Sequence, residues 1–213
     1  MKSTWIILAL AGPVFADCAP QKMVRIETRN VTPGLAAGDF AALPKVLYRL
    51  GNGRLRLEEQ PDPRMKVQLL FLIDAPDSWS IDLEKKVGEH VVDTAESKTV
   101  HAPVFSDEGL PKEVAALEFG CENAFVKDPT TIHARQEMSN GGVTLKHSVI
   151  SGPWKATLAY REGADRPYAA TLSKDGKVVM ALKYVSYQTV ATVPEGFFSP
   201  PADFSIKEPK PGR

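Results

Sequence analysis

Short alternating segments joined by tight turns constrain the fold of this chain more than any other feature. Residues 46–50 and 54–58 alternate apolar and polar side chains on either side of Gly51-Asn52-Gly53. An Asn-Gly pair is typical of a two-residue hairpin turn, because both central residues of that turn need a positive φ angle. The first clear element is therefore predicted to be a β-hairpin.

The Asn52-Gly53 turn also predicts the register of this hairpin. Leu50 then faces Leu55 and Tyr48 faces Leu57, which gives one apolar face. The opposite face gathers three guanidinium groups, from Arg49, Arg54 and Arg56. These groups could bind an anionic head group or the carboxylates of a partner. The simpler interpretation, which we favour, is an exposed face balanced by nearby acidic side chains.

Strand patterns recur along the rest of the chain. Residues 67–73 and 79–83 flank a turn at Pro76, and the first of these segments is apolar on both faces towards its end. Such a strand is expected at the centre of a sheet or in a cavity wall. Four later segments are also predicted strands, namely 143–150, 154–160, 168–173 and 177–188.

One helix interrupts the strands. Pro111 suits a first helical position, and one helical face then carries Leu110, Val114, Leu117 and Cys121. Consecutive hairpins with one clear helix predict a mainly β fold of the α+β type. We expect a curled antiparallel sheet, or half-open β-barrel, with one or two helices packed on it.

The domain is expected to cover residues 17–204, with a solvated C-terminal tail over residues 205–213. Before that tail, the proline-rich stretch 193–201 is predicted to lack regular structure, and the neighbouring side chains of Phe197 and Phe198 should anchor it to the body.

Residues 1–16 have the features of a secretory signal peptide. A basic start precedes an apolar run, and small residues lead to a predicted cut after Ala16, which makes Asp17 the first mature residue. The run is shorter than the roughly 20 apolar residues that span a bilayer. The sequence thus predicts a periplasmic or secreted protein that does not span the membrane.

The two cysteines, Cys18 and Cys121, are consistent with a location outside the cytoplasm. An oxidising compartment favours a disulfide between them, although two free thiols remain an alternative. A third interpretation places lipid on Cys18, and the acidic neighbour Asp17 argues against it.

The charge balance excludes one class of partner. Loss of Lys2 with the signal peptide leaves 25 of the 26 basic side chains against 26 acidic ones, a formal charge of −1. A protein that binds nucleic acid needs a basic excess to neutralise phosphates. The same balance argues against a strongly cationic protein of the membrane surface.

No pattern in the sequence predicts catalysis. The four histidines are His90, His101, His133 and His147, and no two of them have the spacing of two or four residues that builds a metal site within one element. A site assembled in space is left open, but scattered histidines are the favoured interpretation. No Gly-x-Ser-x-Gly motif is present. We therefore expect no enzyme activity, no cofactor and no metal.

The large aromatic side chains allow two interpretations. They could form a plain core or line a cavity on the concave side of a curled sheet, because both demand alternating apolar residues. With the three arginines above they are the candidate ligand contacts: Tyr48, Phe71, Trp79, Trp154, Tyr160, Tyr184 and Tyr187.

Several segments resemble the periplasmic lipoprotein-carrier (LolA/LolB-like) superfamily. The similar stretches include residues 154–158, 166–172, 175–187 and 197–204, together with the arginine-bearing strands within 48–58. The resemblance implies a half-open barrel whose helices form a lid over an apolar cavity, and partners that are acyl chains or lipid-modified proteins. The amphipathic N-terminal helix of that superfamily has no counterpart at residues 30–45, which prolines and glycines interrupt.

Two hypotheses follow, and the sequence favours the first. The first is a non-enzymatic binding protein whose cavity takes a lipid, an acyl chain or another amphiphile. The second is an interaction module of the same fold, with a filled core, that docks another protein of the cell envelope.

Overall fold

The computed structural model describes residues 18–36, 38–93, 99–107, 109–139 and 141–209. The predicted signal peptide lies outside these residues. The described chain contains two short α-helices, α1 (Lys112–Ala115) and α2 (Glu122–Lys127), and the 3₁₀ turn η1 (Phe40–Ala42). Its strands are β1 (Val24–Asn30), β2 (Lys45–Leu50), β3 (Arg54–Glu59), β4 (Leu69–Asp74), β5 (Asp77–Asp82), β6 (Val87–Val92), β7 (Ile132–Glu137), β8 (Val143–Ser151), β9 (Trp154–Arg161), β10 (Pro167–Lys174), β11 (Lys177–Thr189) and β12 (Ser205–Lys207).

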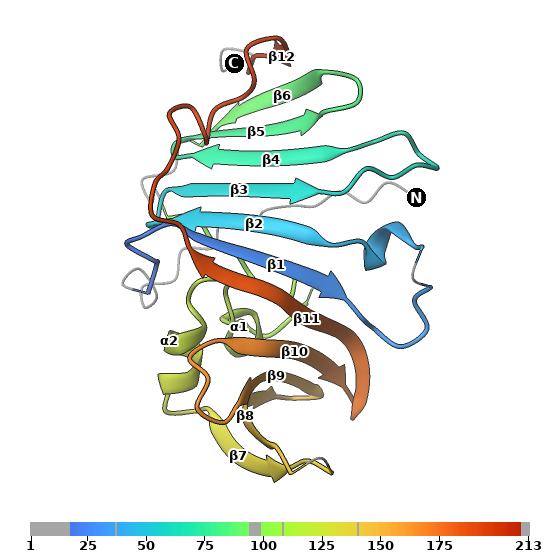
Figure 1. The fold of residues 1–213 in the computed structure, drawn as a ribbon, viewed down its shortest axis with the longest axis vertical. Helices are drawn as coiled ribbons and strands as arrows, with labels where there is room; N and C mark the ends of the chain where they lie inside the picture. The colour runs from blue at the N-terminus through green and yellow to red at the C-terminus, as the bar shows by residue number, and fades with distance from the viewer. Residues whose placement is uncertain (1–17, 37, 94–98, 108, 140, 210–213) are drawn as a thin grey trace.

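These strands form one sheet in the order β12-β6-β5-β4-β3-β2-β1-β11-β10-β9-β8-β7. Neighbours are antiparallel except at one edge, where β12 pairs with β6 in parallel. The sheet does not close, because β12 and β7 form its two edges. Figure 1 shows that β7–β10 curl round while β2–β6 lie nearly flat. The predicted fold class, a mainly β curled antiparallel sheet with few helices, is confirmed.

The first and last long strands join the two halves of the sheet. β1 pairs with β11 along its whole length and with β2 on its other side. A bulge interrupts the β1–β11 ladder between Glu27 and Thr28. Because an extra residue in a strand reverses the alternation of faces, Tyr184 and Tyr187 on β11 come to lie on the same face.

The main core lies on one face of the sheet, which we call the inner face. It is formed by inner-face side chains of β1–β4 and β8–β11 together with residues 100–105, α1 and α2. Val114 and Leu117, from the region of α1, are completely buried there. Figure 1 shows α1 and α2 beside the curl of β7–β11. The two helices therefore cover the inner face of the curled part of the sheet.

A second, smaller core lies on the opposite, outer face. It consists of Leu70, Leu72 and Ile81, with Phe204 and Ile206 of the C-terminal segment packed against it. Ile73, one residue away from Leu72, belongs to the main core instead. The apolar character of 67–73 on both faces therefore reflects a strand that packs on both sides, as expected of a central strand.

The predicted register of the first hairpin is wrong by one residue. Arg49 pairs with Leu55 and Tyr48 with Arg56, so a three-residue loop, 51–53, joins β2 and β3. The loop is held from outside, because Gly51 N–H donates to Pro20 O and Asn52 O accepts from Val100 N–H. A slip of one residue exchanges the two faces, so Arg49 does not share a face with Arg54 and Arg56.

The helix predicted at Pro111 is short, and a second helix follows it, in agreement with the expected one or two helices. α1 ends at Ala115, and α2 begins at Glu122 after Gly120, which has a φ angle of +83°. A positive φ is incompatible with a continuing right-handed helix, and glycine adopts it at low cost. Val114, Leu117 and Cys121 are nevertheless buried, as the pattern indicated.

The four predicted strands of the second half are confirmed within one or two residues as β8–β11. The turn between β10 and β11 contains Asp175 and Gly176 with φ angles of +51° and +76°, as a type I′ turn requires. Residues 205–207, placed in the solvated tail by the sequence analysis, form β12. Among the described residues, no helix has the length and apolar character to cross a bilayer.

Candidate functional site

The candidate residues are divided between the two faces of the sheet. Tyr48, Arg54, Arg56 and Trp79 lie on the outer face, as the pairing of β2–β5 places them opposite the main core. Phe71 lies on the inner face and is half-buried. The remaining ones belong to the inner-face core or border it: Arg49, Trp154, Tyr160, Tyr184 and Tyr187.

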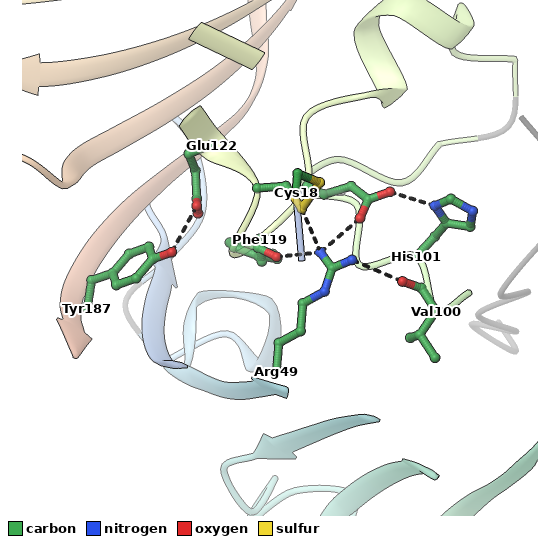
Figure 2. Close-up of a disulfide and its surroundings, with 9 residues drawn as sticks. Cys18, Arg49, Val100, His101, Phe119, Glu122 and Tyr187 are labelled. Atoms are coloured by element: carbon green, nitrogen blue, oxygen red, sulfur yellow. Dashed lines mark hydrogen bonds and ion pairs between the residues drawn. A yellow bond between two sulfur atoms is a disulfide. The ribbon is translucent and has the colours of Figure 1, made fainter. Parts of the chain in front are cut away.

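Arg49 is the most unexpected of them, since the residue is 1% exposed. Its Nη1 donates to the carbonyl oxygen of Phe119 at 2.7 Å, and its Nη2 donates to that of Val100 at 3.1 Å. Nη1 also lies 2.8 Å from a carboxylate oxygen of Glu118, which is 5% exposed. Figure 2 shows this guanidinium directed at the disulfide and the Phe119 carbonyl.

The segment 118–122 gathers these interactions. Glu118 pairs with Arg49 and accepts a hydrogen bond at 2.6 Å from Nδ1 of His101. Cys121 forms the disulfide with Cys18, which confirms the predicted pairing, and its sulfur lies 3.5 Å from Arg49 Nη1. The disulfide is compatible with an extracytoplasmic location. This network fixes the connection between α1 and α2 against β2.

Gly120 fits tightly inside the segment. A Cβ added there would lie 3.3 Å from the Pro20 ring and 3.4 Å from the Arg49 side chain. Together with the positive φ angle, this close approach makes glycine the residue that suits the position. Residues 18–20, the 118–122 segment and Arg49 thus pack as one unit.

Glu122 begins a second polar cluster on the inner face. Its two carboxylate oxygens accept hydrogen bonds from the hydroxyl groups of Tyr184, at 3.3 Å, and Tyr187, at 3.0 Å. The β11 bulge directs both tyrosines to this carboxylate. Burial raises the pKa of Glu122, because desolvation disfavours the charged form more than the hydrogen bonds stabilise it.

Tyr160 is another buried tyrosine of the inner-face core. Its ring packs edge-on against His147 at 5.4 Å, and its hydroxyl is buried without a hydrogen-bond partner among the described residues. Arg166 lies over the Tyr187 ring at 4.3 Å. Tyr184 and Tyr187, for which the sequence left core and cavity lining both open, thus donate to a buried carboxyl group.

The raised pKa of Glu122 predicts a pH-dependent contribution to stability. The folded carboxyl group holds its proton above the unfolded pKa of about 4.3, so its contribution is complete below that pH and is lost as the pH rises through the folded pKa. We expect Glu122→Gln to lose less stability than the wild type when denaturant unfolding is measured from pH 4 upwards. The exposed Glu195→Gln variant is the control, and an equal pH dependence in Glu122→Gln and wild type would contradict the prediction.

On the outer face, the C-terminal segment covers two of the candidates. Phe197 packs edge-on against Tyr48 at 4.9 Å, and the Arg56 guanidinium lies over the Phe197 ring at 4.7 Å. Arg56 also donates to the Phe197 carbonyl oxygen at 2.9 Å. The next residue, Phe198, is buried, so the expected anchoring by the paired phenylalanines is confirmed.

Trp79 stacks on His90 near the edge of the sheet, with ring centroids 4.9 Å apart. His90 contacts Glu208 at 2.7 Å and Asp77 at 2.8 Å, and these carboxylates, Glu208 first, raise its pKa. Glu208 follows β12, so the cluster ties the end of the described chain to β5 and β6.

The inner face of β4–β6 is more exposed than that of β8–β11, which packs in the main core. Register places Leu69 and Phe71 on it beside Val87 and Val91. The two valines are 44% and 57% exposed. Between them lie polar residues of β5 and β6, namely Ser78, Ser80, Asp82 and Glu89. We call this surface the open inner face.

Two of the four histidines meet in space, which their sequence spacing did not indicate. His133 on β7 and His147 on β8 are directly opposite in the ladder, and their Nδ1 atoms are 2.7 Å apart. No group of three or more His, Cys, Asp or Glu side chains in the described part of the chain could hold a metal ion.

Two of the hollows in the described surface lie away from the main core. One, of about 480 Å³, lies by the β7–β8 turn and is lined by residues that include Thr144, Arg161 and Tyr168. The other, of about 180 Å³, lies between β6 and β12 beside His90. Neither is lined by the buried aromatic side chains of the main core.

The described geometry defines a mainly β protein with an open, curled sheet that is filled at one end. The sequence matches no protein-family model and no curated protein. The structure is similar to that of an uncharacterized conserved protein from Thermus thermophilus, with a TM-score of 0.52, 12% identity, and coverage of 89% of this chain and 91% of that chain. At this identity the similarity shows a shared fold alone.

The structure of PNGF-II was also compared with this one. It gives a TM-score of 0.36 at 7% identity, over 88% of this chain and 31% of that chain. A score this low carries no argument about fold or function.

Proposed function

We propose that this protein is a non-enzymatic, extracytoplasmic interaction module that docks another protein of the cell envelope on its open inner face. The observation that supports the proposal is the difference in side-chain burial between two parts of the inner face. One half packs Trp154, Tyr160 and Tyr184 into a core, whereas the inner face of β4–β6 leaves Val87 and Val91 exposed.

The composition of this face favours a protein over an acyl chain. The polar inner-face residues of β5 separate the apolar residues of β4 from the valines of β6, and Asp82 and Glu89 form ion pairs with Lys85 and Lys207. An alkyl chain could not replace the water around these groups, whose burial without partners is unfavourable. A protein surface brings both apolar groups and hydrogen-bond donors, as mixed interfaces do.

The lipid-carrier hypothesis rests on the same surface. The half-buried Leu69 and Phe71 lie next to Leu57, and an amphiphile would need this apolar stripe. The two hypotheses differ in what should be found bound, and one experiment separates them.

The experiment places a photo-crosslinking amino acid at Phe71 or Val91 in cells, with Ile150 as the matched control. Ile150 is 54% exposed and lies on the outer face of β8. We expect a discrete adduct with one envelope protein from the first two positions, absent at Ile150 and lost when Leu69→Asp is added. Equal adducts from all three positions would overturn the proposal. A co-purifying lipid, or binding of a fluorescent fatty acid that Leu69→Asp abolishes, would support the carrier instead.

A further inference from the structure

The pair formed by His133 and His147 has the geometry of two ligands of one metal ion. The two residues lie directly opposite on β7 and β8. Such cross-strand neighbours have Cβ atoms about 4.5–5.5 Å apart, so both rings reach the same point above the sheet. Their ring centroids are 5.0 Å apart with planes at 75°, and the Nδ1 atoms face one another at 2.7 Å.

Two imidazole nitrogens this close must share a proton, because one nitrogen has to donate to the lone pair of the other. A metal ion can take the place of that proton. Two nitrogens bound at about 2.0–2.1 Å lie about 2.9–3.4 Å apart in square-planar or tetrahedral geometry. The rings would therefore need to separate by less than about 1 Å from the observed 2.7 Å.

The surroundings position one ring and leave the other able to move. The Tyr160 ring packs against His147 and holds its orientation. His133 is on the exposed edge strand β7, so its ring can adjust to an incoming ion.

The charges around the pair do not oppose a cation. Arg135 lies two residues beyond His133 on the same face of β7, and its guanidinium contacts Glu162 at 3.1 Å and Glu137 at 3.6 Å. Lys146 is next to His147 but faces the other side of the sheet, because adjacent strand residues alternate. The two carboxylates balance Arg135 and add a negative charge nearby.

We propose that His133 and His147 together bind one divalent transition-metal ion of the imidazole-preferring class, Zn²⁺, Ni²⁺ or Cu²⁺, through their Nδ1 atoms. Water fills the other coordination positions, because no third His, Cys, Asp or Glu of the described residues completes the set. A two-imidazole site follows the usual order of affinity, in which Cu²⁺ binds more tightly than Ni²⁺ or Zn²⁺. Mg²⁺ and Ca²⁺, which prefer oxygen ligands, are excluded.

Calorimetric titration of the protein, purified without a histidine tag, tests the site. We expect one Zn²⁺ per chain at pH 7.5, with affinity falling more than about tenfold in His133→Asn and in His147→Asn, since even loss of an outer-shell partner costs that much. His90→Asn and His101→Asn are the matched controls, because these histidines are engaged by carboxylates. Their affinity should remain that of the wild type.

Cu²⁺ provides a second readout that does not depend on affinity. The electron paramagnetic resonance spectrum of the bound ion should show coupling to two imidazole nitrogens in the wild type and to one fewer in either variant. His133 is exposed, so His133→Asn should keep the wild-type circular dichroism spectrum and melting temperature. Absence of binding, or equal affinity in His133→Asn and wild type, would overturn the proposal.

Discussion

Replacing Arg49 by methionine is expected to destabilise the folded protein by about 3–5 kcal/mol, as found when one partner of a buried ion pair is removed. Methionine keeps the unbranched stem of the side chain but removes the guanidinium, which leaves the buried Glu118 carboxylate without this cation. The carbonyl oxygens of Phe119 and Val100 also lose their donor. The change in unfolding free energy is measured by denaturation with urea.

Arg54 is the matched control on the same hairpin. Its guanidinium and the Asp74 carboxylate form an ion pair with side chains 50% and 40% exposed. An exposed pair contributes about 0–1 kcal/mol, so Arg54→Met should be nearly neutral. The double variant Arg49→Met/Glu118→Leu should recover part of the lost stability, because both buried charges are then gone. Equal effects of Arg49→Met and Arg54→Met would contradict the buried network.

Loss of the disulfide is expected to cost about 2–5 kcal/mol. Cys18 and Cys121 are separated by 103 residues in the sequence, and closing a loop of this length removes much entropy from the unfolded chain. The bond also joins the N-terminal residues to the 118–122 segment, where Arg49 is bound. The test compares the denaturation midpoints of the wild type and Cys18→Ala/Cys121→Ala.

A reducing agent supplies the control for this comparison. It should lower the midpoint of the wild type towards that of the double variant, and it should leave the double variant unchanged. A wild-type midpoint insensitive to complete reduction, verified by thiol labelling, would contradict the prediction.

The burial of Arg49 changes what the basic hairpin can bind. The sequence grouped three arginines as a candidate binding surface, but each has a different environment in the structure. Arg49 is buried, Arg54 pairs with Asp74, and Arg56 is covered by Phe197. An anionic ligand would have to displace these partners, so our proposal places docking on the open inner face instead.

The sequence alone determined β8–β11 and the turns that join them, because local rules are sufficient there. Asp175-Gly176 adopts the two positive φ angles of its turn, and alternation in β9 and β10 matches the buried inner face. The pairing of Cys18 with Cys121 was also predicted correctly from the count of cysteines and the expected compartment.

Tertiary contacts decided the remaining features. The loop at Gly51 follows its hydrogen bonds to Pro20 and Val100 rather than its own turn preference, which moves Arg49 into the core. β7 has no buried residue, so no alternation marks it, and the meeting of His133 with His147 depends on the β7–β8 register. Periodicity reflects the burial of residues within one strand. The pairing register of two strands, and the segments that cover each face of the sheet, depend instead on contacts between residues far apart in the chain. For that reason, only the folded structure could distinguish a filled curl from an open inner face.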